Sequence, residues 1–172
     1  ESSLQESIQK FSGFMDYDQV FLLDSVEIVK NNTTSILSIV SINSSFHMGK
    51  SQTEHTLTEL EFVGLAFLQK DYGNVLIRRE TIADKINELI NKKEVDFEID
   101  KEFSRKYYVL ASDKEKLKRN ILHTVLSSIK KQKDAEIEII DSVMLIRIRK
   151  PVSISTAFAI AELLTEINDG IN

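Results

Sequence analysis

In residues 135–150, AEIEIIDSVMLIRIRK, apolar and charged side chains alternate over 135–139 and 146–149, on either side of an Asp-Ser pair. A period of two is typical of strands with one buried face. Asp141 and Ser142 suit the turn between two such strands. The apolar face of the second strand then carries Met144, Ile146 and Ile148. Arg147 and Arg149 fall on the opposite face, so the segment predicts a β-hairpin packed on a core through one side.

Further strands and helices are predicted on both sides of this hairpin. Strands are expected where Val, Ile and Phe are enriched or alternate with polar residues, at 19–30, 34–43, 57–69, 74–80, 95–99 and 105–111. Helices are expected where apolar residues recur every three or four positions, at 3–13, 81–93, 113–131 and 153–170. The pattern predicts the α+β class: a single domain over residues 1–172, with an antiparallel or mixed sheet of about six to eight strands and about four helices mainly on one face.

Local signals predict where two of the helices begin and where one ends. Ser3 with Glu6, and Ser112 with Glu115, have the spacing of capping boxes, in which each side chain bonds the other residue's free backbone N–H. Gly13 is expected to stop the first helix in a left-handed conformation.

Two further expectations concern packing. Gly64 interrupts the strand at 57–69 and predicts a bulge or a close backbone contact. The last helix is expected to face the core with Phe158, Ala161, Leu164 and Ile167.

Length and composition exclude several classes of protein. A chain of 172 residues buries a core without disulfides, and the absence of Cys excludes thiol nucleophiles, Fe–S clusters and Cys-based zinc sites. No apolar run reaches the length of a membrane span. The sequence begins at Glu1 rather than Met, which is compatible with an anchor encoded upstream.

Positive charge is concentrated in one part of the chain. Residues 101–133 carry ten Lys and Arg against three Asp and Glu, a balance of +7, whereas the whole chain carries −5. An anion-binding face is therefore expected on and before the helix at 113–131, formed by Arg105, Lys114, Lys118, Arg119 and Lys130. Such a face can contact anionic lipid, nucleic acid or an acidic protein, or can be only a solvated helix surface.

Nucleic acid is the disfavoured partner. Tyr107 and Tyr108 are neighbours on a predicted strand, so only one of them can face outward to stack on a base. The acidic balance of the whole chain also opposes binding to a polyanion.

No constellation of catalytic or metal-binding residues is evident. His47, His55 and His123 lack helical metal-ligand spacing, although His47, His55 and Glu54 together could hold a metal. There is no nucleophile elbow and no glycine-rich phosphate loop. The pairs Glu59/Glu61 and Glu136/Glu138 are expected on outer strand faces, where solvation is the ordinary role of a carboxylate. Neither a cofactor nor a metal is expected.

Three segments resemble a family of uncharacterised bacterial proteins in which a soluble α+β domain follows transmembrane helices. EFVGLAF (61–67) resembles the family's Phe-x-Gly-Leu strand. EFSRKYYVLASD (102–113) resembles its Glu-Phe segment with a later aromatic-x-Val, and EIEIIDSVMLI (136–146) its closing hairpin. The helix after Asp113 departs from the family's small-residue and Pro pattern. The resemblance implies a membrane tether upstream of Glu1 and no particular chemistry.

These observations favour a non-catalytic interaction or assembly module of a bacterial membrane-associated protein, with an unknown protein partner. Its soluble domain is expected on the cytoplasmic side, or the protein is simply cytoplasmic. The alternatives are a hydrolase whose site is not visible in the sequence, and binding of anionic lipid or nucleic acid through the helix at 113–131.

Overall fold

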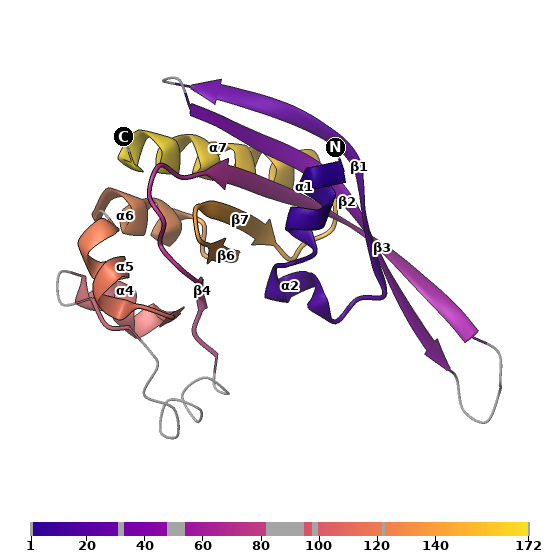
Figure 1. Ribbon diagram of the computed structural model, residues 1–172, viewed down its shortest axis with the longest axis horizontal. Helices are drawn as coiled ribbons and strands as arrows, with labels where there is room; N and C mark the ends of the chain where they lie inside the picture. The colour runs from indigo at the N-terminus through magenta and orange to yellow at the C-terminus, as the bar shows by residue number, and fades with distance from the viewer. Residues whose placement is uncertain are drawn as a thin grey trace.

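The computed structural model of the protein describes residues 2–30, 33–47, 54–81, 95–97, 100–121 and 123–171. In these ranges seven strands form one open sheet in the order β1-β2-β3-β7-β6-β4-β5, and every neighbouring pair is antiparallel (Figure 1). The strands are β1 (Gln19–Lys30), β2 (Thr33–His47), β3 (Glu54–Phe67), β4 (Val75–Arg79), β5 (Tyr107–Ala111), β6 (Ala135–Ile140) and β7 (Val143–Ile148). The helices are α1 (Ser2–Ile8), α2 (Ser12–Met15), α4 (Lys101–Lys106), α5 (Lys114–Asn120), α6 (His123–Lys131) and α7 (Ile154–Ile171). The α+β class is confirmed.

The hairpin predicted at 135–150 is confirmed as β6 and β7. Ile140 pairs with Val143 across the turn. Asp141 has a φ of 57°, a left-handed conformation that Asp adopts more readily than most residues. The hairpin lies inside the sheet, because β7 also pairs with β3 and β6 also pairs with β4.

The prediction of a single helix at 113–131 is wrong, because this segment forms two helices, α5 and α6. Ile121 is extended, with φ −78° and ψ 131°, and its N–H donates to the Leu117 carbonyl to close α5. Both residues are buried, and Val125 on α6 is buried beside them. Neither Gly nor Pro marks the break, and the apolar spacing runs through it unchanged.

Other boundaries also differ from the expectation. α4 occupies residues that were partly predicted as strand, and residues 95–97 form no strand although the Val95 N–H donates to the Val109 carbonyl at 2.9 Å. The helix expected at 81–93 lies almost wholly outside the described residues. α5 is capped by Asp113, which accepts from the Lys116 N–H, and not by Ser112.

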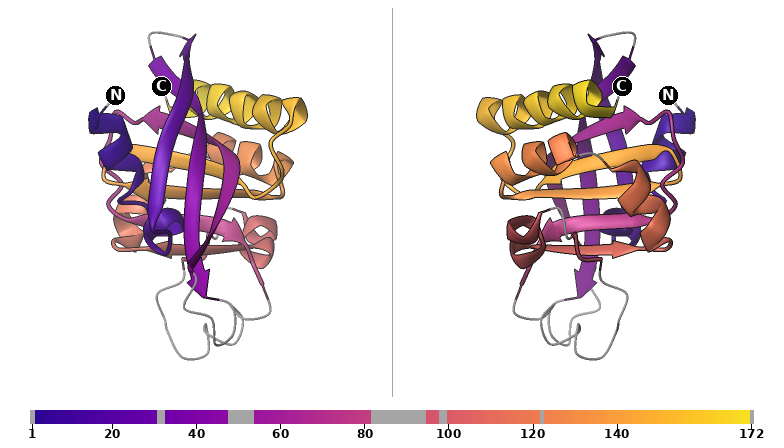
Figure 2. Two further views of the ribbon diagram at one scale, coloured as in Figure 1. Left: turned by 90° about the vertical axis from the view of Figure 1, so that its right-hand side faces the viewer. Right: turned by 90° about the vertical axis from the view of Figure 1, so that its left-hand side faces the viewer.

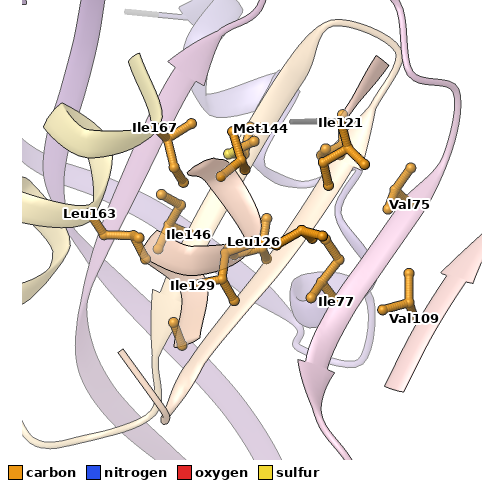
Figure 3. Packing of buried hydrophobic residues seen from close by; sticks show 14 of the residues in the cluster. Val75, Ile77, Val109, Ile121, Leu126, Ile129, Met144, Ile146, Leu163 and Ile167 are labelled. Atoms are coloured by element: carbon orange, nitrogen blue, oxygen red, sulfur yellow. The ribbon is translucent and has the colours of Figure 1, made fainter. Parts of the chain in front are cut away.

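Each face of the sheet has its own hydrophobic core. The larger core lies under α4 to α7, which cover one face as expected, and Figure 3 shows side chains of β4, β5, β7, α6 and α7 meeting there. The smaller core lies on the opposite face, where α1 and α2 bury Ile8, Phe11 and Phe14 against β1, β2, β3 and β7 (Figure 2). The sheet is therefore a central layer with helices on both sides, most of them on one.

Gly64 marks the close approach of α7 to β3, as predicted, and the register there has no bulge. A Cβ at position 64 would lie 2.6 Å from Ile160 Cγ2 and 3.0 Å from Leu164 Cδ1. Ile160, Leu164 and Ile167 face the sheet, whereas the expected inward position of Phe158 is wrong, since its side chain is 70% exposed.

Replacing Gly64 with Ala should destabilise the fold by about 1–3 kcal/mol, because the added methyl group overpacks the α7–β3 contact. Urea unfolding monitored by circular dichroism measures this loss. The double variant Gly64→Ala/Ile160→Ala should lose less than the sum of the two single variants, since truncating the Ile160 side chain leaves room for the new methyl group. Additive losses would contradict the contact.

A buried arginine connects α2 to the sheet. Arg147 on β7 is 1% exposed, and its Nε and Nη2 donate to Glu61 Oε2 on β3 at 3.0 and 2.7 Å. Its Nη1 donates to the Gly13 carbonyl at 2.6 Å, and its guanidinium lies 4.2 Å from the centre of the Phe14 ring. Gly13 lies inside α2, and the first helix already ends at Ile8, so the expectation that Gly13 stops the first helix is wrong. A Cβ there would lie 2.0 Å from Arg147 Nη1.

Carboxylates on the same sheet face complete this attachment. Glu138 on β6 accepts from the Ser12 N–H at 2.8 Å and from its hydroxyl at 2.9 Å, so a side chain from another element caps α2. The paired carboxylates do alternate onto one strand face, as expected. The expectation that they are simply solvated is wrong for Glu61, which is 8% exposed and ion-paired.

Replacing Arg147 with Met should destabilise the protein by about 3–5 kcal/mol, because it leaves Glu61 buried without its partner. The double variant Glu61→Leu/Arg147→Met should recover much of this loss, since no buried charge then remains. Urea unfolding of the parent, both single variants and the double variant gives the comparison. A double variant less stable than Arg147→Met would show that the ion pair is not what the arginine contributes.

Candidate anion-binding cleft

A cleft opens where two neighbouring strands separate. Pairing of β4 with β6 ends at Ile77↔Ile137, while β4 stays paired with β5 up to Arg79↔Tyr107 and β6 stays paired with β7 up to Ala135↔Ile148. The end of β4 and the start of β6 therefore diverge, and they leave a cleft of about 600 Å³. This volume lies in the range of small-molecule sites.

Five cationic side chains from three segments line this cleft. Because β4 and β7 are both antiparallel to β6, the ends of β4 and β7 and the start of β6 meet at one end of the sheet. The cations are Arg78, Arg79, Lys133, Arg149 and Lys150. The described lining has only two carboxylates, Asp134 and Glu136. We call this set of seven residues the cationic cleft.

Both carboxylates are already engaged by cations. Lys150 Nζ lies 2.5 Å from Asp134 Oδ2, and Arg149 Nη2 lies 3.2 Å from Glu136 Oε1. The hydrogen bond from Lys150 lowers the pKa of Asp134, and the nearby charges of Lys150, Arg79 and Lys133 lower it further. Asp134 is thereby held ionised near neutral pH.

The positive charge continues into a smaller adjoining pocket of about 240 Å³. This pocket shares Arg79 and Lys133 with the cationic cleft and adds Lys106 and Lys130. Lys106 lies 2.7 Å from Glu102, and the hydrogen bond from Lys106 lowers the pKa of Glu102. The described lining of the two spaces together holds seven cations and three carboxylates, on a chain whose net charge is −5.

Two of the five residues expected to form an anion-binding face, Lys130 and Lys114, line different pockets. Lys130 lines the smaller pocket and contacts the buried Asp100 at 2.6 Å. Lys114 instead lines a cleft with Ala111, at the other end of β5. The five residues of β5 span about 13 Å. Arg105, Lys118 and Arg119 are exposed and line neither the cationic cleft nor the smaller pocket.

Sequence reasoning missed the strand-end cations. The doublets at 78–79 and 149–150 each close a predicted strand, and this is the signal that could have drawn attention to them. Their meeting depends on β6 lying between β4 and β7, a neighbour order that does not follow the chain.

The three residues that could hold a metal, His47, Glu54 and His55, lie at the end of β2 and at the start of β3. His47 is the strand partner of Glu54, and Phe46 is the partner of His55. Within the described ranges, no group of three or more His, Asp and Glu side chains is arranged to hold a metal.

Replacing Lys150 with Gln should raise the pKa of Asp134 toward its ordinary value, because the strongest contact on the carboxylate is lost. Carboxyl ¹³C NMR titration measures both values. Since the folded-state pKa is depressed, this ion pair stabilises the protein above the unfolded aspartate pKa, and the contribution disappears as the pH falls through the folded value. Lys114→Gln, at the far end of β5, should leave the Asp134 pKa unchanged. An ordinary pKa for Asp134 in the parent would contradict the geometry.

None of the described helices is long and apolar enough to cross a membrane. Comparisons with protein-family models, with curated proteins and with solved structures give no match to this chain. The resemblance drawn from three segments therefore stays a prediction, and the functional conclusion depends on the geometry of the cationic cleft.

Proposed function

We propose that this protein is a binding module that takes a phosphate-bearing anion in the cationic cleft. The observation that carries the proposal is the convergence of five Lys and Arg side chains, from β4, the segment after β7 and the α6–β6 connection, on one cleft with two carboxylates. Arg guanidinium groups offer paired donors that match phosphate oxygens, and Lys adds point charges. An expected ligand has two or more phosphate groups, because the cations continue from the cleft into the adjoining pocket.

The chemistry of the described lining favours binding over catalysis. Asp134 and Glu136 contact Lys150 and Arg149, and the lowered pKa of Asp134 makes it a poor general acid near neutral pH. Thr81 is the hydroxyl-bearing residue of that lining, and the lining includes no His. A hydrolase remains the alternative proposal, and phosphate release from pyrophosphate by the pure protein would favour it.

Binding of inorganic pyrophosphate, measured by isothermal titration calorimetry at low ionic strength, tests the proposal. The variant Arg79→Gln/Lys133→Gln should bind about tenfold more weakly or worse, because each substitution removes a contact between charged groups. Both side chains are exposed and neither is buried in a core, so the fold should persist. Affinity should also fall as salt is added.

The matched control is Lys114→Gln/Lys118→Gln, which removes the same charge from α5 at the other end of β5. With both double variants measured in about 0.1 M salt, where the Debye length is about 10 Å, its affinity should stay within about twofold of the parent, since β5 separates α5 from the cleft by about 13 Å. Equal losses in the two double variants would mean that net charge, and not the cleft, attracts the anion. No measurable binding by the parent would overturn the proposal.

A further inference from the structure

Exposed apolar side chains follow the cationic cleft directly in the sequence. Lys150 is followed by Pro151, and then Val152 is 38% exposed, Ile154 78% and Phe158 70%. Ile154 opens α7, and Phe158 lies one turn later on the same side of that helix. This side is opposite to the one that packs on the sheet through Leu164 and the other buried residues of α7. Two large apolar side chains therefore lie exposed one turn apart on α7.

The apolar and cationic residues share one edge of the molecule. A groove of about 570 Å³ is lined by Leu60 and Val152 together with Arg149 and Lys150, the last two of which also line the cationic cleft. Its lining also includes Glu59 and Glu61, the second of which is paired with Arg147. Leu60 is 46% exposed. Because β7 leads into α7 at this edge, the start of α7 lies just beyond the end of β7 (Figure 2). Positive charge and exposed apolar groups are therefore adjacent.

We infer that this edge docks on an anionic phospholipid surface, with lipid phosphates at the cationic cleft and with Ile154 and Phe158 inserted among the acyl chains. The inference rests on the proposed function, since the lipid headgroup is then the source of the phosphate. Basic side chains attract an anionic leaflet, and exposed apolar side chains at the same edge add burial in the interface. Charge complementarity also favours this orientation, because the chain as a whole is acidic and five cations gather at this edge.

The first turn of α7 suits the boundary between water and lipid. Ser153 caps the helix by accepting from the Thr156 N–H at 3.2 Å, and its hydroxyl also lies 2.9 Å from that of Ser155. Ser153 and Ser155 are exposed. Exposed hydroxyl groups therefore flank Ile154 and can contact polar headgroups when it inserts.

Co-sedimentation of the full chain with vesicles tests the inference. The parent should bind phosphatidylcholine vesicles that contain about 30% phosphatidylserine, and binding should fall at high salt and on pure phosphatidylcholine. The variant Ile154→Ser/Phe158→Ser should reduce the partition coefficient about tenfold, because the inserting groups are lost. Its affinity for pyrophosphate should stay at the parent value, since neither residue lines the cationic cleft.

The matched control is Val26→Ser/Val29→Ser, which removes two exposed apolar side chains from β1, at the other edge of the sheet from β5. It should bind vesicles like the parent. If the parent binds pyrophosphate but no vesicles, the proposed function stands and the membrane inference is overturned. If neither ligand binds, both fail. Self-association that Ile154→Ser/Phe158→Ser abolishes, without vesicle binding, would assign the edge to a second copy of the chain and would also overturn the inference.

Discussion

The ion pair of Arg147 with Glu61 is the contact on which the second face of the sheet depends. A guanidinium that is 1% exposed must have its charge compensated and its donors satisfied, because an unpaired buried charge is strongly destabilising. Glu61 supplies the charge, and the Gly13 carbonyl takes a third N–H. The same arginine therefore joins β3 and β7 in the middle of the sheet and holds α2 over them. The hydrophobic residues of the smaller core on that face surround this ion pair.

The cationic cleft follows from the sheet and not from a dedicated loop. β4 stays with β5 while β6 stays with β7, so one pair of neighbours must separate before the sheet ends. The polar residues at the end of β4, at the start of β6 and after β7 line the space that this separation leaves. Glu136 connects the two polar centres, since its carboxylate lies 3.2 Å from Arg149 in the cleft and 4.0 Å from the buried Arg147. The strand ends thereby position the site, and the α6–β6 connection adds Lys133 to it.

Local patterns predicted much of the fold. The hairpin at 135–150 and the strand at 19–30 could be read from the sequence because alternation and turn chemistry are properties of neighbouring residues. The break at Ile121 could not, since an apolar period continues through a bend that only tertiary packing requires. The burial of Arg147 could not be predicted either, because alternation indicates on which face of a strand a residue lies but not whether another element covers that face. The cleft was missed because three segments far apart in the sequence contribute to it.

The central position of β7 has a consequence for the order in which the protein folds. β1, β2 and β3 pair in sequence as a meander, so their contacts close short loops and can form early. The contact between Glu61 and Arg147 joins residues 86 positions apart, and the β3–β7 ladder beside it closes a loop of similar length. Closing so long a loop costs more chain entropy before any contact compensates for it. The two halves of the sheet are therefore expected to assemble separately, and the β3–β7 seam is expected to form late and to limit the folding rate.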